Sequence, residues 1–223
     1  MESLISLPSK QILRQYRRLR AHLQQLNKEL VGQIPRQAIM DVAARLGIRR
    51  GDTLVFDHAD QSSVLMDCCL FDWINGGLNL VQRYHGQHPA VVGTLDADAR
   101  DAQLAAEFHI LVVGEPVRGL GVQVEDYLTR QPQFLIDEGF SRTVAARPDL
   151  CLASRIMPAY GHSMTTGAAL PMSPEAVEAM VARMAAEGKL LNPDRTPRNP
   201  HSFALAVVRH ALRTGAMDHV RYA

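Results

Sequence analysis

Three polar side chains within four residues form the first candidate for chemistry in this sequence. They are Asp57, His58 and Asp60. Two carboxylates and an imidazole can bind a divalent cation or act as a general acid and base. They join an extended stretch to a helix, and functional residues often lie in such connections. The alternative is structural: Asp60 and the serines that follow cap the helix, and the other two side chains are solvated.

The cysteine and histidine pairs do not favour a metal site. Cys68 and Cys69 are adjacent, so on a helix their side chains point about 100° apart. His85 and His88 have no matching pair downstream. With Cys151 the cysteine count is three, which suits reduced core thiols better than a disulfide framework. We therefore expect no bound metal.

Other catalytic motifs are weak or absent. Ser141 and His162 could join an aspartate, but Ser141 lacks the second glycine of a nucleophile elbow. The sequence contains no phosphate loop with a Gly-Lys-Ser/Thr ending and no Gly-x-Gly-x-x-Gly run that opens a helix. The sequence therefore predicts no cofactor and favours a protein that is not an enzyme.

The strongest pattern is an apolar seam near the start of the chain. Its members are spaced by four and three residues in turn and are Ile12, Tyr16, Leu19, Leu23, Leu26 and Leu30. This spacing predicts a helix over 9–31 that lies against another surface. The seam is under three heptads long, so it needs either its own domain or a twin helix to pack on.

The remainder of the same helix is basic. Arg14, Arg17, Arg18 and Arg20 are candidates for phosphate contacts. Residues 1–50 carry a net charge of +7, whereas residues 51–150 carry −9. The arginines are therefore either a solvated face, partners of the acidic middle within one chain or across a dimer, or a nucleic-acid surface. Few aromatic residues accompany them, so nucleic acid is not the favoured partner.

The order of apolar patterns predicts an α+β protein. Residues 1–107 are expected to be mostly helical, 108–172 to form a small antiparallel β meander or barrel, and 173–223 to form helices. Short alternating runs between glycines and prolines indicate the β unit. The three regions are expected to form one or two compact domains.

Composition indicates a soluble, cytoplasmic protein. Of the 223 residues 47% are apolar and 21% charged, which is typical of globular proteins. No apolar run approaches the ~20 residues of a membrane span. The first residues lack the basic start and apolar stretch of a signal peptide.

Two stretches are similar to an uncharacterised group of bacterial proteins, some of which carry a SEC-C zinc motif. The first stretch covers 65–73, with the sequence LMDCCLFDW, and 79–84, with the sequence NLVQRY. The second runs from Val122 through DEGFSR at 137–142 to RIMP at 155–158. The resemblance implies a helical segment followed by a small β unit. This chain shows no SEC-C motif, so the resemblance implies neither a zinc site nor an activity.

These observations lead to three functional hypotheses. The first is a non-enzymatic adaptor or regulatory protein that self-associates or binds a protein partner, because the seam is strong and the catalytic motifs are weak. The second is a metal-assisted hydrolase that uses Asp57, His58 and Asp60. The third is nucleic-acid binding through the basic helix.

Overall fold

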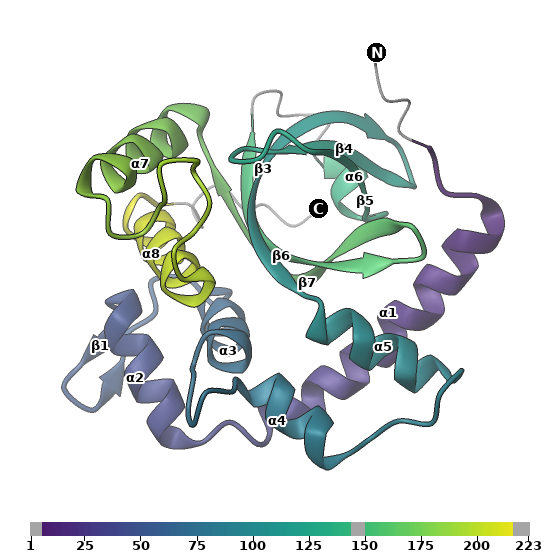
Figure 1. Ribbon diagram of the computed structural model, residues 1–223, viewed down its shortest axis with the longest axis horizontal. Helices are drawn as coiled ribbons and strands as arrows, with labels where there is room; N and C mark the ends of the chain where they lie inside the picture. Colours follow the sequence, from purple (N-terminus) through teal and green to yellow (C-terminus); the bar gives the residue numbers. More distant parts are fainter. Residues whose placement is uncertain (1–5, 144–149, 216–223) are drawn as a thin grey trace.

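The computed structural model describes residues 6–143 and 150–215, and it confirms an α+β fold with helices before and after a β-barrel (Figure 1). The N-terminal elements are α1 (Lys10–Val31), α2 (Arg36–Leu46), β1 (Arg49–Arg50), β2 (Thr53–Leu54), α3 (Gln61–Phe71), α4 (Leu80–Gln87) and α5 (Leu95–Leu104). The barrel region contains β3 (Glu107–Val117), β4 (Gly121–Asp126), β5 (Pro132–Ile136), α6 (Phe140–Thr143), β6 (Cys151–Ala159) and β7 (His162–Met172). The last helices are α7 (Pro174–Glu187) and α8 (Pro200–Arg213).

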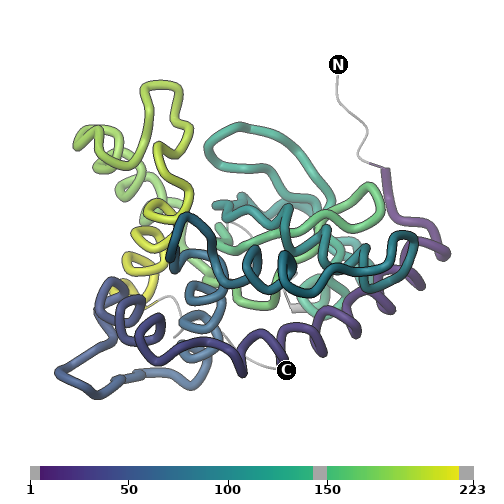
Figure 2. The backbone as a smooth tube through the Cα atoms, turned by 60° about the horizontal axis from the view of Figure 1, so that its bottom comes forward, coloured from purple at the N-terminus to yellow at the C-terminus, as the bar shows by residue number. Residues whose placement is uncertain are grey.

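Helix α1 begins and packs as its sequence predicts. Ser9 is the N-cap, and its hydroxyl accepts a hydrogen bond from the amide of Ile12 at 3.2 Å. The seam residues Tyr16, Leu19, Leu23, Leu26 and Leu30 are buried, while Ile12 is partly buried. They pack against α3, α4, α5 and the outer surface of the barrel, and α1 and α5 run alongside each other (Figure 2). The seam is therefore covered by this chain itself.

The five strands close in the order β3-β4-β5-β7-β6. All neighbours are antiparallel except β5 and β7, which are parallel and meet at Leu135 and Ser163. This parallel pair closes the barrel. The sequence analysis predicted an antiparallel β unit and did not predict this pair. At Gly121 a Cβ atom would collide with the carbonyl oxygen of Leu135, so this crossing of β4 and β5 requires glycine.

Apolar side chains form three clusters around the strands. The barrel interior holds Leu111, Val122, Val124, Leu135, Leu152 and Ile156. A second cluster joins the outer face of β3, β6 and β7 to α2, α3, α7 and α8. A third joins the barrel to α1, α4 and α5. Helix α3 contributes to both outer clusters, which is why it is apolar on nearly every side.

Among the described residues no helix is both long enough and apolar enough to cross a membrane.

The three cysteines are free and buried, and burial raises the pKa of Cys69 to about 12 and that of Cys151 to about 11. Thiols of this kind behave as small apolar core residues.

Candidate functional site

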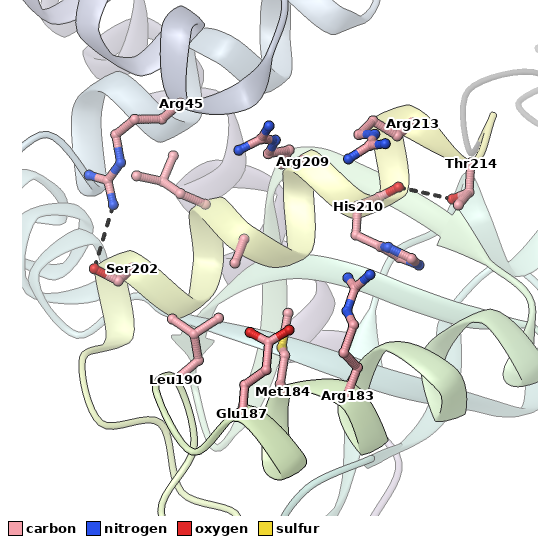
Figure 3. A pocket seen from close by; sticks show the side chains of 12 residues that line it. Arg45, Arg183, Met184, Glu187, Leu190, Ser202, Arg209, His210, Arg213 and Thr214 are labelled. Carbon is pink, nitrogen blue, oxygen red and sulfur yellow. Dashed lines mark hydrogen bonds between the residues drawn. The ribbon is translucent and has the colours of Figure 1, made fainter.

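A basic groove lies where α2, α7 and α8 meet (Figure 3). The residues at the start of α8 fix where this helix begins. The Asn199 side chain caps the helix by accepting a hydrogen bond from the Ser202 amide at 2.8 Å, and Pro200 occupies the first helical position. One face of the helix enters the core with Phe203, Val207 and Ala211. The other side of the helix is left to line a groove of about 600 Å³.

Four arginines converge on this groove. They are Arg45 from α2, Arg183 from α7, and Arg209 and Arg213 from α8. Among the described residues, Arg45 is the only one of the four whose side chain has a hydrogen-bond partner, the Ser202 hydroxyl at 3.5 Å. Within 6–143 and 150–215 none of the four forms an ion pair with a carboxylate, although Glu187 also lines the groove. The groove therefore carries an excess of positive charge that the described residues do not neutralise.

The pKa of His210 is affected by burial and by this positive charge. Its ring lies beside the guanidinium of Arg183 in Figure 3. Burial lowers the pKa of His210 below its ordinary value, and the charges of Arg183 and Arg213 lower it further. The histidine is therefore neutral near pH 7, and an anion in the groove would favour its protonated form.

The floor of the groove is apolar. Met184 and Leu205 are buried beneath it, and Leu190 and Ala206 are partly exposed to it. Guanidinium groups donate hydrogen bonds but do not exchange protons near neutral pH. The arrangement is thus suited to binding an oxyanion that carries apolar groups. Glu187 and His210 also line the groove, but neither side chain forms an ion pair within the described part of the chain.

A second group of charges is buried between the helices and the barrel. Arg155 of β6 donates to Asp67 at 3.2 Å and to Asp72 at 2.6 Å. The Thr166 hydroxyl donates to Asp67 at 2.8 Å, and His201 Nδ1 lies 3.3 Å from Asp72. These five residues, the Arg155 cluster, connect α3 to β6, β7 and α8.

Two carboxylates of the Arg155 cluster neutralise the charge of Arg155. The Arg155 guanidinium lies 4.5 Å above the Phe71 ring and is 5% exposed. Burial alone would lower the pKa of Arg155, but Asp67 and Asp72 outweigh it and raise that pKa. Within the described part of the chain no buried side-chain nitrogen or oxygen lacks a hydrogen-bond partner. The cluster therefore acts as a structural clamp.

The structure brings together two of the three residues predicted for chemistry. His58 Nδ1 lies 3.2 Å from an Asp60 carboxylate oxygen. Asp57 is exposed, and its amide donates to the Gln61 side chain at 3.0 Å. None of the three lines the basic groove. Across 6–143 and 150–215, no three His, Cys, Asp or Glu side chains are placed to hold a metal ion.

The arginines of α1 do not form a free cationic face. Arg17 pairs with Glu138 at 2.7 Å, which joins the basic first helix to the acidic middle of the chain. Arg20 donates to the Thr165 carbonyl oxygen at 2.8 Å. Arg14 and Arg18 are exposed. The predicted phosphate contacts are thus divided between intramolecular partners and solvent.

Sequence reasoning missed the basic groove because its residues are far apart along the chain. One signal was available: Arg209 and Arg213 are separated by four residues, so they share one face of α8. No pattern in the sequence places Arg45 or Arg183 next to them. Their convergence depends on how α2 and α7 pack against α8.

The fold and site define an α+β protein in which helices packed around a five-stranded barrel form a cationic groove. The chain belongs to a family of unknown function, DUF7986, whose model matches residues 10–203. Arg45 and Arg183 lie inside the matched range, and Arg209 and Arg213 lie beyond it. Searches of curated proteins and of solved structures found no match.

Proposed function

We propose that this protein is a non-enzymatic adaptor or regulatory protein that binds an acidic, partly apolar segment of a protein partner in the basic groove. One observation carries the proposal: Arg183, Arg209 and Arg213 converge over an apolar floor without an ion-pair partner among the described residues. Unpaired cations repel one another and lower stability, so such an arrangement is best explained by an anionic ligand.

The dimensions of the groove suit a peptide segment. From Ser202 to Arg213 the α8 backbone rises ~16 Å, at 1.5 Å per residue. That length corresponds to roughly five extended residues or three helical turns of a partner. Arg45 lies at the Ser202 end, and Arg213 lies at the other end. Acidic side chains of the partner would face the arginines, and its apolar side chains would cover Leu190 and Ala206.

Nucleic acid is the second candidate, and the row of arginines along α8 is the observation that favours it. Two features argue for a peptide instead. Among the described residues, the groove lining contains no Phe, Tyr or Trp side chain on which a base could stack, and His210 is its one aromatic ring. The apolar floor offers nothing to a phosphodiester backbone. The metal-assisted hydrolase has less support, because Asp57 does not join His58 and Asp60.

Fluorescence anisotropy with two labelled probes tests the proposal. The first probe is a 12-residue peptide with leucines at helical spacing and glutamates between them, and the second is a 20-nucleotide oligo-dT. We expect the peptide to bind more tightly than the oligonucleotide. The double variant Arg209→Glu with Arg213→Glu should weaken peptide binding at least ~10-fold, since charge-assisted hydrogen bonds contribute about 1.5–3 kcal/mol each.

The matched control is Arg14→Glu with Arg18→Glu, which makes the same charge change on the exposed face of α1. This variant should leave peptide binding within about two-fold of the wild type, because long-range charge effects are screened by salt. Equal losses in the two double variants would contradict a specific groove. Tighter binding of oligo-dT would favour nucleic acid. Light scattering would show whether a second copy of this chain supplies the acidic segment.

A further inference from the structure

A second cleft, separate from the basic groove, lies between α1, α3 and the β6–β7 ribbon. Its volume is about 440 Å³, within the range of small-molecule sites. Leu23, Leu70 and Met164 form a buried apolar floor. Polar groups at its edge come from α1, α3 and β7, so three separate segments of the chain converge on it.

A β-bulge shapes one wall of this cleft. In β6 and β7, Ser154 pairs with Ala169 and Ile156 pairs with Thr165, so residues 166–168 lie opposite a single residue of β6. Gly167, at the centre of the bulge, has φ +119°, which L side chains rarely adopt. The bulge directs the Thr166 hydroxyl to Asp67 at 2.8 Å. Bulges of this kind often re-aim side chains beside binding sites.

Two opposite charges, those of Arg20 and Asp67, lie at the cleft. Each contacts one of two neighbouring residues of β7, Thr165 and Thr166. Arg20 Nη1 donates to the Thr165 carbonyl oxygen at 2.8 Å and to the Thr165 hydroxyl at 3.4 Å, and the Nε and Nη2 groups have no partner in the described part of the chain. Asp67 lines the same cleft, and its side chain is 11% exposed. Its two oxygens accept from Thr166 and Arg155, and each retains a further lone pair.

We propose that this cleft binds a small zwitterion with an apolar side chain, either a free amino acid or a dipeptide. The ligand carboxylate contacts the unpaired N–H groups of Arg20, and the ligand ammonium contacts Asp67. The apolar side chain covers Leu23, Leu70 and Met164. Opposite charges beside an apolar floor match this ligand class. A ligand that is only an anion or only a cation would pair with one of the two side chains and not with the other. The proposal does not depend on the occupant of the basic groove.

Isothermal titration calorimetry with L-leucine, Leu-Leu, acetyl-Leu-Leu and Leu-Leu-amide tests this assignment. We expect L-leucine or Leu-Leu to bind, and the tighter of the two identifies the length of the ligand. Removing either terminal charge of Leu-Leu should weaken binding at least ~10-fold, because each cap removes a charge-assisted contact. Equal binding of the capped and free dipeptides would overturn the proposal, as would an absence of binding to both uncapped probes.

Variants locate the binding in the cleft. Arg20→Met keeps the apolar stem but removes the guanidinium, so it should weaken Leu-Leu at least ~10-fold and abolish the preference over Leu-Leu-amide. Arg18→Met, on the exposed side of the same helix, should change neither. Ser63→Phe, at the exposed rim, should block the cleft without burying a charge, while Ser63→Ala should leave binding unchanged. Full binding by Ser63→Phe and Arg20→Met would exclude this cleft.

Discussion

Two groups of arginines in this protein differ in what neutralises them. Arg155 is buried and held by two carboxylates of its own chain, at 3.2 Å from Asp67 and 2.6 Å from Asp72. Arg183 and Arg209 are exposed around a groove and have no carboxylate partner within the described residues. In the first arrangement the Arg155 charge is neutralised within the chain, and its removal would leave the two carboxylates without their cation. The second leaves binding capacity for an anion. The same residue type is therefore neutralised by its own chain in one region and left without a carboxylate partner among the described residues in the other.

The largest expected effect comes from removing the cation of the Arg155 cluster. Arg155→Met leaves Asp67 and Asp72 buried without their partner, so it should lower the free energy of unfolding by about 3–5 kcal/mol. Urea denaturation measures this change. The control is Arg130→Met, which breaks the exposed pair with Glu125 and should cost no more than about 1 kcal/mol. Similar costs for both variants would show that the Arg155 cluster is not a clamp.

A double variant sharpens the same point. Adding Asp72→Asn to Arg155→Met removes one of the two stranded buried charges and should recover about 1–3 kcal/mol of the lost free energy of unfolding. Adding Asp52→Asn instead should recover nothing, because the Asp52 side chain is 85% exposed. A double-mutant cycle in urea gives both values. Additive losses would mean that Arg155 and Asp72 act independently.

In the groove, replacing an arginine should raise the free energy of unfolding, whereas replacing Arg155 should lower it. Arg209→Glu replaces two like charges four residues apart by a Glu–Arg pair with Arg213, so it should raise the free energy of unfolding by about 0.5 kcal/mol. The same change should weaken binding of the acidic peptide. Arg209→Gln, which removes the repulsion without adding the pair, should give a smaller gain. A loss of stability in Arg209→Glu would show that the arginine serves the fold.

The smallest expected effect concerns pH. Burial, with the charges of Arg183 and Arg213, lowers the pKa of His210 below its ordinary 6.5. The unfolded chain therefore binds this proton at a higher pH than the folded chain does. The stability that neutral His210 contributes is present above pH 6.5 and is lost as the pH falls through the lowered folded pKa.

The corresponding measurement compares urea denaturation of wild type and His210→Gln at pH 7.5 and pH 5. The wild type should lose more stability on acidification than the variant, and the acidic peptide should reduce this difference by favouring protonated His210. Equal losses in the two proteins would show that the pKa of His210 is not lowered in the folded chain.

Local patterns predicted most elements of the fold. The seam spacing located α1 correctly, and the structure shows that Ser9 and Ser173 are the caps at which α1 and α7 begin. Alternating residues indicated the barrel strands at 108–172. These predictions are confirmed because caps and side-chain periodicity depend on residues within a few positions of one another. Barrel closure is different: the parallel pairing of β5 with β7 joins residues 28 positions apart through contacts that no local pattern specifies.

The candidate sites show the same limit. Asp57, His58 and Asp60 attracted attention because they are close in sequence, yet the backbone leaves Asp57 exposed and apart from the other two. The groove and the Arg155 cluster unite residues from separate helices and strands. Sequence spacing therefore indicated only the Arg209 and Arg213 pair of the groove, and nothing of the cluster. Arg155 lies within the predicted β unit at 108–172, and only its burial beside Asp67 and Asp72 distinguishes it from the other residues there.

The sequence by itself determined the helices, the strand content, the α+β class and the need of α1 for an apolar surface, because these follow from local backbone preferences and side-chain periodicity. Only the tertiary structure decided that α1 is covered by its own chain, that Arg155 is neutralised inside the fold, and that the arginines of α2, α7 and α8 face a shared groove. The physical reason is that burial and charge pairing depend on distances in space, which packing sets between residues far apart along the chain.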